Sequence, residues 1–216
     1  MKWGILFDLD GTLLNSLTDL TVGVNHGLAA FGLPPRTPME IRSYLGNGAR
    51  QLVALAMPGR ENDPPVDEVL AAYRAYCKDH TRDFTKPYDG ILEALEELKD
   101  IPMAVVSNKP DRETVSLCKA FFPDLLARGE RPECPRKPAP DMLRKAMAQL
   151  GVDTCVYVGD SDVDVLTAKN TGVPCLSVLW GFRDKKCLEE AGGTDFCSDP
   201  RDLAKCLTQM VRRLDF

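Results

Sequence analysis

The chain has 216 residues, of which 44% are hydrophobic and 27% charged, so it can bury a sizeable core in one domain or two small ones. Its 32 acidic and 27 basic residues give a net charge of -5, which argues against nucleic acid and anionic membranes as partners. No apolar run approaches the length of a membrane span, and the first one is too short for a signal peptide. We therefore expect a cytoplasmic protein.

An apolar run at Trp3 to Phe7 predicts a buried first strand. The segment from about Ser16 to Phe84 then has helical spacing and no convincing strand. Its predicted helices cover residues 17–31, 38–45, 49–56 and 66–76, and the polar stretch Pro58 to Pro65 predicts a loop. This pattern indicates an all-helical insert after the first strand.

From Tyr88 onward, apolar strands alternate with helices. The predicted strands lie at residues 103–106, near 125, at 155–158 and at 175–178, and the helices at 91–98, 113–121, 139–150, 162–171 and 201–212. Such alternation is typical of βαβ units and a parallel sheet. We therefore expect an α/β fold in which the first strand belongs to the later part of the chain.

Two acidic residues follow the first predicted strand. Asp8 and Asp10 lie two apart, so their side chains leave the same face of an extended chain. Gly11 permits a tight turn before Thr12, whose hydroxyl can hydrogen-bond near the pair and is expected to help bind phosphate. The structural interpretation is an Asp-Gly turn that closes a strand. The chemical one is that ionised Asp8 attacks phosphorus while Asp10 protonates the leaving oxygen and later deprotonates water.

Two further acids stand at a later strand end. Ser161 and Asp164 form a capping-box pattern, which accounts for Asp164 structurally, whereas Asp160 precedes the cap and has no such duty. Because the carboxyl ends of parallel strands meet at one edge, these acids and the first pair are expected to share a crevice. Mg²⁺ would relieve their repulsion, with Asp8, the backbone carbonyl of Asp10 and Asp160 as its ligands.

Ser107 and Asn108 follow the strand at residues 103–106, and Lys137 lies in the proline-rich loop Pro135 to Pro140. As structural residues, Ser107 would cap the next helix and Lys137 would be a solvated charge. As functional residues, the Ser107 hydroxyl and the Asn108 backbone N–H would hold a phosphoryl oxygen. The stiff loop would then aim the Lys137 ammonium at the phosphoryl charge.

In this order, the motifs resemble those of the haloacid dehalogenase superfamily: Asp8-x-Asp10-x-Thr12, Ser107, Lys137 with Pro-x-Pro, and Gly159-Asp160-x-x-x-Asp164. The resemblance implies a Rossmann-like core of residues 1–14 and 85–216, a helical cap domain of residues 15–84, and Mg²⁺ as cofactor. It implies Asp8 as nucleophile and Asp10 as general acid and base. It also implies that Asp164 orients a metal-bound water or Lys137.

Other segments are similar to the phosphoglycolate phosphatases within this superfamily: residues 10–20, 31–35, 41–50, 106–110 and 180–183. Asn15 is a departure, because those enzymes more often carry Asp there. The resemblance implies a small phosphorylated metabolite as substrate, 2-phosphoglycolate first. We expect a monomer or homodimer. In the cap, the turn Gly46-Asn47-Gly48 and neighbouring Arg42 or Arg50 are predicted to meet a substrate carboxylate.

The motifs leave several other functions to weigh. Asp10 argues against a dehalogenase, since the related halide-releasing enzymes need no acid there, and the segment before His26 lacks the His and aromatic pattern of β-phosphoglucomutase-like isomerases. Pyrophosphatase and nucleotide monophosphatase are closer alternatives. A non-enzymatic binding module would be expected to have lost one of the motif residues, and none is lost. The eight cysteines contain no C-x-x-C pair and are expected to be reduced and packed as small residues.

Overall fold

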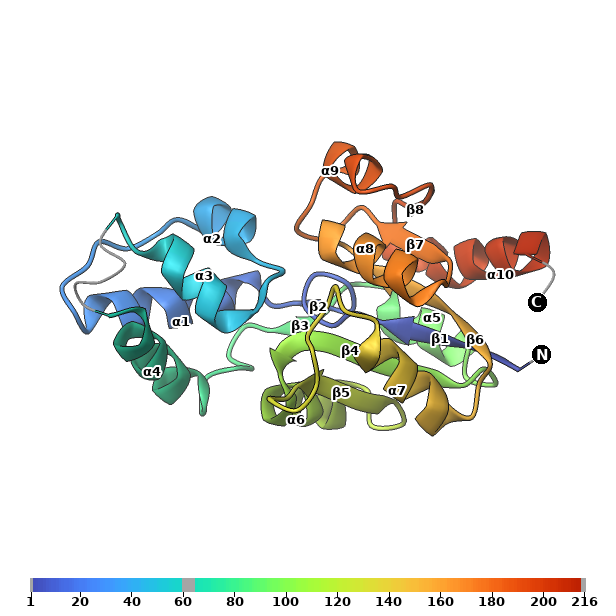
Figure 1. Cartoon of the computed structure of the whole chain (residues 1–216), viewed down its shortest axis with the longest axis horizontal. Coiled ribbons are helices and arrows are strands. Elements are labelled where there is room, and N and C mark those ends of the chain that lie inside the picture. Colours follow the sequence, from blue (N-terminus) through green and yellow to red (C-terminus); the bar gives the residue numbers. More distant parts are fainter. Residues whose placement is uncertain (1, 60–64, 215–216) are drawn as a thin grey trace. The chain divides into compact units, whose positions relative to one another are not determined.

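The computed structural model describes residues 2–59 and 65–214 (Figure 1). Within the predicted loop Pro58 to Pro65, residues 60–64 lie outside the described part. Six strands form one parallel sheet in the order β5-β4-β1-β6-β7-β8. Their bounds are β1 Trp3–Phe7, β4 Met103–Pro110, β5 Leu126–Glu130, β6 Thr154–Gly159, β7 Cys175–Val178 and β8 Asp195–Cys197. The predicted α/β fold with a parallel sheet is confirmed.

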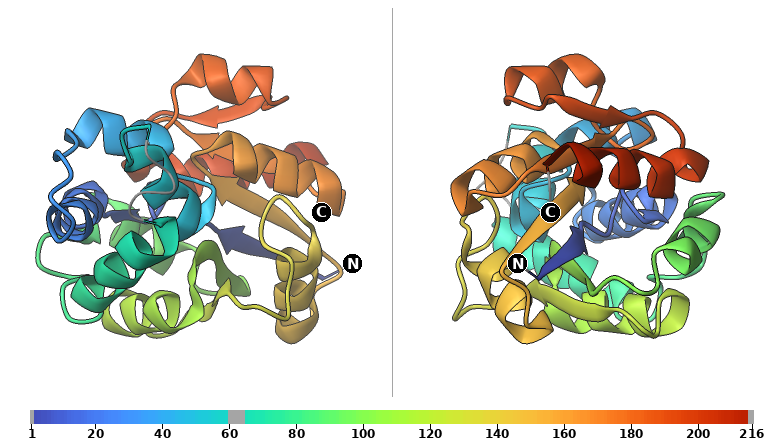
Figure 2. Two further views of the ribbon diagram at one scale, coloured as in Figure 1. Left: turned by 60° about the vertical axis from the view of Figure 1, so that its left-hand side comes forward. Right: turned by 90° about the vertical axis from the view of Figure 1, so that its right-hand side faces the viewer.

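Helices cover both faces of this sheet (Figure 2). On one face, α5 (Ile91–Glu97), α6 (Asp111–Phe121) and α10 (Leu203–Leu214) pack on β1 residues such as Phe7. On the other, α7 (Asp141–Leu150) and α8 (Asp162–Thr171) pack on Leu6. Both faces are therefore buried, which explains why these strands read as continuous apolar runs rather than alternating ones.

The sheet register brings several strand ends to one edge. Phe7 at the end of β1 pairs with Val105 of β4 and with Val158 of β6. Asp8 and Asp160 therefore follow adjacent parallel strands at the same, carboxyl edge. This is the edge where open α/β sheets bind their ligands.

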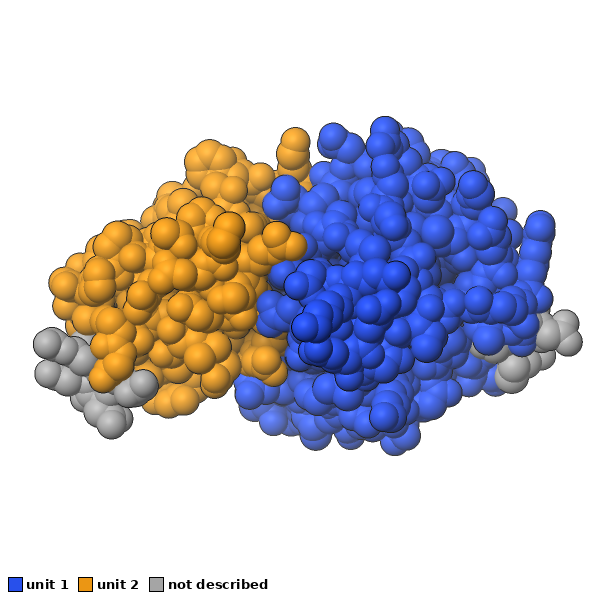
Figure 3. Space-filling view, turned by 90° about the horizontal axis from the view of Figure 1, so that it is seen from above, with its two compact units in different colours: residues 1–15, 87–216 blue, residues 16–86 orange. Residues whose placement is uncertain are grey.

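The chain divides into two compact units, Met1–Asn15 with Pro87–Phe216, and Ser16–Lys86 (Figure 3). The second unit contains α1 (Leu17–Ala29), α2 (Pro38–Tyr44), α3 (Gly48–Ala56) and α4 (Val66–Cys77). Its α2 begins with a capping box between Thr37 and Glu40. Inside this unit the buried Asp19 carboxylate accepts hydrogen bonds from the backbone of Phe84 and Thr85. No helix among the described residues is both long and apolar enough to span a bilayer.

Some elements differ from the sequence prediction. The short helix α9 (Lys185–Glu190) and the three-residue strand β8 were not predicted, and neither were the two-residue strands β2 (Leu14–Asn15) and β3 (Lys86–Pro87), which pair with each other. A short 3-10 helix, Pro200–Asp202, precedes α10.

β4 runs on to Pro110, so Ser107 and Asn108 lie within this strand rather than after it. They occupy the irregularity where the β4–β5 register shifts between Val106 and Pro110.

Candidate active site

The buried side chain of Lys137 is the centre of a polar network at the carboxyl edge of the sheet. Its Nζ lies 2.9 Å from Asp8 Oδ1 and 2.7 Å from Asp164 Oδ1, and it donates to Tyr157 Oη at 2.8 Å. An ammonium has three N–H donors, and here three oxygens surround it. Burial opposes the charge on Lys137, but the charges of Asp164 and Asp8 outweigh burial and raise the pKa of this lysine.

The backbone of Lys137 is also held in place. Its N–H donates to Asn108 Oδ1 at 2.9 Å, and Asn108 Nδ2 donates to the Lys137 carbonyl at 3.0 Å. The Asn108 side chain therefore positions the lysine loop, while the predicted contact of its backbone N–H with phosphate stays a prediction. Ser107 beside it is buried, and its Oγ accepts a hydrogen bond from the Lys109 backbone N–H at 3.2 Å.

Asp164 is fully buried and has both carboxylate oxygens in use. Oδ1 accepts from Lys137 and lies 3.0 Å from Tyr157 Oη, and Oδ2 accepts from the backbone N–H and the hydroxyl of Ser161. Ser161 accepts in return from the Asp164 N–H, which completes the capping box of α8. One residue thus caps a helix and orients Lys137, so the structural and functional interpretations of Asp164 both apply.

Asp160 is buried immediately after β6. Its Oδ1 accepts from Thr12 Oγ1 at 2.9 Å, and its Oδ2 accepts from the backbone N–H of Phe182 at 2.7 Å. Burial, together with the charges of Asp164 and Asp8, holds the pKa of Asp160 well above its ordinary value. The Thr12 hydroxyl, predicted near the phosphoryl group, is directed at this carboxylate.

Asp8 is the third buried carboxylate of the cluster. Burial raises its pKa to about 6, and the nearby Lys137 charge opposes that rise. Asp10 is not one of these three clustered carboxylates, and its Oδ2 lies 3.1 Å from Lys109 Nζ. Sequence reasoning assigned no role to Lys109 or to Tyr157. The position of Lys109, two residues after Ser107, could have indicated a contact with the site. Tyr157 gives no such indication, because it lies within a predicted apolar strand.

The cluster fits a hard divalent cation. Asp8, Asp160 and Asp164 offer carboxylate oxygens that all lie within 4.8 Å of one another, and Lys137 Nζ contacts Asp8 and Asp164. When all three carboxyls are ionised, the single charge of Lys137 leaves excess negative charge for a cation to balance, and oxygen donors are those that Mg²⁺ prefers. Since four hydrogen bonds occupy Asp164, the carboxylates best suited to hold the ion are Asp8 and Asp160.

The predicted cap residues all lie in the unit Ser16–Lys86. Arg50 Nε is 2.9 Å from Asp67 Oδ1, in a pair whose side chains are more than half exposed. Gly46 and Gly48 have positive φ angles of 111° and 79°, and Asn47 between them precedes α3. Arg42 lies on α2. The predicted contact of these residues with a substrate carboxylate stays a prediction.

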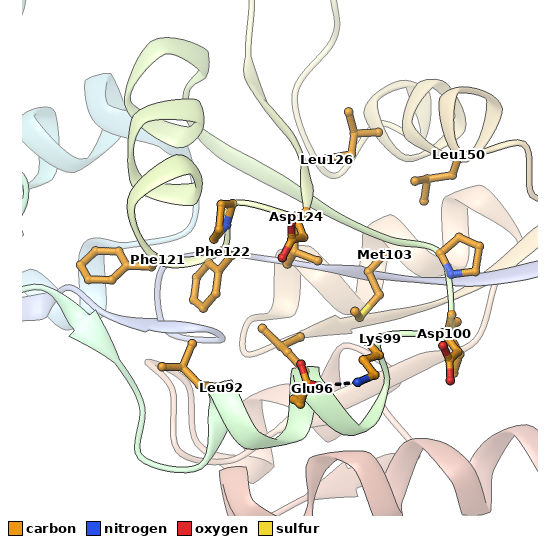
Figure 4. A pocket seen from close by; sticks show the side chains of 15 residues that line it. Leu92, Glu96, Lys99, Asp100, Met103, Phe121, Phe122, Asp124, Leu126 and Leu150 are labelled. Atoms are coloured by element: carbon orange, nitrogen blue, oxygen red, sulfur yellow. Dashed lines mark hydrogen bonds and ion pairs between the residues drawn. The ribbon is translucent and has the colours of Figure 1, made fainter.

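A cavity of about 560 Å³ lies at the opposite edge of the sheet, between the ends of α5 and α6 and the starts of β4 and β5 (Figure 4). Its walls are mainly apolar, with Leu92, Phe121 and Met103 among them, and Glu96 pairs with Lys99 at its side. None of the clustered carboxylates lines it. The candidate active site is therefore identified by its polar network and not by the size of a cavity.

Comparison with known proteins identifies the family. Residues 5–178 match the family described as haloacid dehalogenase-like hydrolases. The chain belongs to this family. Phosphoglycolate phosphatase 1 of Pseudomonas aeruginosa is 35% identical to it over 220 residues, covering 95% of this chain and 79% of the relative. The phosphoglycolate phosphatase of Neisseria meningitidis is 34% identical over 203 residues, covering 88% of this chain and 86% of the relative.

Solved structures share the fold of this chain. One from Lactobacillus delbrueckii subsp. bulgaricus has a TM-score of 0.87 and 32% identity, with 96% of this chain and 99% of that chain covered. A predicted phosphoglycolate phosphatase from Haemophilus somnus has a TM-score of 0.84 and 26% identity, covering 94% and 96%. The Rossmann-like core of the haloacid dehalogenase-like family is therefore the fold of this chain.

Proposed function

We propose that this protein is a Mg²⁺-dependent phosphatase that hydrolyses 2-phosphoglycolate through a phosphoaspartyl intermediate. Family membership and the phosphatases among its relatives support the coarser statement that the chain is a phosphoric monoester hydrolase. The observation that carries the finer mechanism is the Lys137 ammonium held 2.9 Å from Asp8 Oδ1 in a buried, acid-rich site. We propose that it acts in the cytoplasm as a monomer or homodimer, with neither nucleic acid nor membrane as partner.

In the first step, an ionised Asp8 oxygen attacks phosphorus and the bond to the leaving oxygen breaks. Asp10 in its protonated form gives its proton to that oxygen, so the alcohol leaves neutral and phosphate stays on Asp8. In the free protein Asp10 Oδ2 lies 3.1 Å from Lys109 Nζ.

In the second step, Asp10 takes a proton from water, and the resulting hydroxide oxygen attacks phosphorus. Phosphate is released and Asp8 is regenerated. Lys137 keeps the Asp8 carboxylate in place and offers positive charge to the phosphoryl oxygens, and the Ser107 hydroxyl and Asn108 N–H would hold them. Mg²⁺ held by Asp8, the Asp10 carbonyl and Asp160 would supply further positive charge to counter that of the transferring group.

The choice of 2-phosphoglycolate rests on the relatives that carry that name and on the similar cap segments. We propose that the helical unit closes over the substrate, and that Arg42 or Arg50 with the Gly46 to Gly48 turn binds its carboxylate. Core motifs act on the phosphoryl group that all candidate substrates share. The insert must therefore make the selection.

A panel of phosphoesters tests this proposal. Purified protein would be assayed with 2-phosphoglycolate, p-nitrophenyl phosphate, pyrophosphate and nucleoside monophosphates, each with Mg²⁺ and with a chelator, and ranked by kcat/KM. We expect 2-phosphoglycolate to rank first and every activity to require Mg²⁺. A higher rank for pyrophosphate or a nucleotide would contradict 2-phosphoglycolate as the substrate. Full activity in the presence of chelator would contradict Mg²⁺ as the cofactor.

A further inference from the structure

The Asp160 carboxylate is enclosed by two glycines from distant parts of the chain. A Cβ on Gly11 would lie 2.3 Å from Asp160 Oδ2, and a Cβ on Gly181 would lie 2.2 Å from Asp160 Cβ and 2.4 Å from Oδ2. Real Cβ atoms do not approach so closely, so neither position accepts a side chain without moving the carboxylate. Gly11 has a φ of 88°, which independently favours glycine there.

The loop after β7 contacts this carboxylate and its neighbour. The Phe182 N–H donates to Asp160 Oδ2 at 2.7 Å, and Trp180 Nε1 donates to the Thr12 carbonyl at 3.0 Å. Thr12 in turn donates its hydroxyl to Asp160 Oδ1. Trp180 is thereby connected to Asp160 through Thr12, and Phe182 is connected to it directly.

The same loop is also fixed at its two ends. Arg183 Nε lies 3.2 Å from Asp162 Oδ1, at the start of α8, and the Trp180 ring meets the Tyr88 ring edge-on at 6.4 Å between centroids. The segment from Trp180 to Arg183 therefore contacts Thr12 after β1, Asp160 after β6, and the start of α8 at Asp162. One hydrogen bond to Asp160 is donated by this segment, and Trp180 bonds the backbone of the residue that donates the other.

We propose that the loop Trp180–Phe182 is the positioning element of Asp160, and that it sets the affinity of the site for a divalent cation without touching the substrate. This inference rests on the proposed function, because it takes Asp160 as a metal ligand. Groups that orient a metal ligand through hydrogen bonds commonly change metal affinity by about 10- to 100-fold when they are lost. Trp180 is thus a positioning residue and not a catalytic one.

The test is a calorimetric titration of metal-free protein with Mg²⁺. Trp180→Phe keeps an aromatic ring but removes the indole donor, and we expect its dissociation constant for Mg²⁺ to rise about tenfold. We also expect kcat to recover at saturating Mg²⁺, because the substrate-binding and reacting groups are untouched. Trp3→Phe is the matched control: it changes the other tryptophan, at the opposite end of β1, and should leave the dissociation constant within about twofold.

A second variant, with its own control, separates a displaced Asp160 carboxylate from a general loss of stability. Gly181→Ala should weaken Mg²⁺ binding by about 100-fold, since its Cβ would displace the Asp160 carboxylate. The control is Gly151→Ala: this glycine has a φ of 68°, so an alanine there strains the backbone, but its Cβ meets no atom within 4 Å and Mg²⁺ affinity should be unchanged.

The outcomes separate this inference from the proposed function. Wild-type Mg²⁺ binding with unchanged affinity in Trp180→Phe and Gly181→Ala would contradict the inference alone. If the wild-type protein binds no Mg²⁺, both the proposed Mg²⁺ cofactor and this inference are contradicted. Weakened binding in the two loop variants, with both controls at wild-type affinity, would support it.

Discussion

Lys137 Nζ lies 2.7 Å from Asp164 Oδ1, and both side chains are almost completely buried. This pair differs from a surface ion pair because neither group can regain water if its partner is removed. Asp8 shares the same ammonium at 2.9 Å, so one cation supports two carboxylates. The stability of the site and its chemistry therefore depend on the same side chain.

Lys137→Met should lower both stability and activity. Removing one partner of a buried pair costs about 3–5 kcal/mol, because the carboxylates stay buried without their cation. Loss of a fixed charge on the transferring group should also reduce kcat by about 100-fold or more. Urea unfolding and steady-state kinetics measure the two effects. Lys99→Met is the control, since the pair of Lys99 with Glu96 is exposed. If Lys137→Met lost no more stability than Lys99→Met, the structural role of Lys137 would be contradicted.

The metal-free protein should lose stability as pH rises from about 4 to about 6. Burial raises the Asp8 pKa from 3.8 to about 6, so in that range the folded state binds more protons than the unfolded state. Stability then falls with rising pH, by about 3 kcal/mol for this group. Unfolding in a chelator from pH 4 to 7 should show a shallower decline for Asp8→Asn. Parallel profiles of wild type and variant would contradict the assignment.

Tyr157→Phe should weaken the site without removing a charge. The Tyr157 hydroxyl accepts from Lys137 and lies within hydrogen-bond distance of the Val106 carbonyl and Asp164, so its loss leaves buried polar groups unpaired. We expect the free energy of unfolding to fall by about 1–3 kcal/mol and kcat to fall with it. Tyr76→Phe, in the helical unit, is the control. Equal stability of both variants would show that the hydroxyl contributes nothing.

Arg42→Ala and Arg50→Ala test the predicted carboxylate contact. The residue that binds the substrate carboxylate should show a KM for 2-phosphoglycolate raised about tenfold or more, because charged hydrogen bonds contribute about 1.5–3 kcal/mol. The KM for p-nitrophenyl phosphate, which lacks a carboxylate, should change little. Asp67→Asn controls for loss of the Arg50–Asp67 pair. Equal losses on both substrates would contradict this role.

Much of the core could be predicted because strand ends leave a local mark in the sequence. Asp8 and Asp160 each follow a short apolar run, and a parallel sheet brings such ends to one edge. The capping box of Ser161 and Asp164 is also a local pattern, and the structure confirms it. Local patterns of this kind need no knowledge of tertiary contacts.

The features that escaped prediction depend on contacts between distant residues. Trp180 and Thr12 are 168 positions apart, and their hydrogen bond exists only once β1, β6 and β7 are adjacent. Tyr157 looks like an ordinary apolar strand residue until the register places its hydroxyl next to Lys137. The extension of β4 to Pro110 also depends on pairing with β5. Short elements such as β8 carry too few residues for a recognisable period.

The central claim is that Asp8 attacks phosphorus and carries the phosphoryl group. Borohydride reduces an acyl phosphate and converts the aspartate that carries it to homoserine, which peptide mass spectrometry locates. After the protein is mixed with 2-phosphoglycolate and Mg²⁺ and quenched with borohydride, we expect homoserine at Asp8, and none when Mg²⁺ or substrate is left out. Turnover of the substrate with homoserine at another acidic residue, or with none at Asp8, would contradict the account.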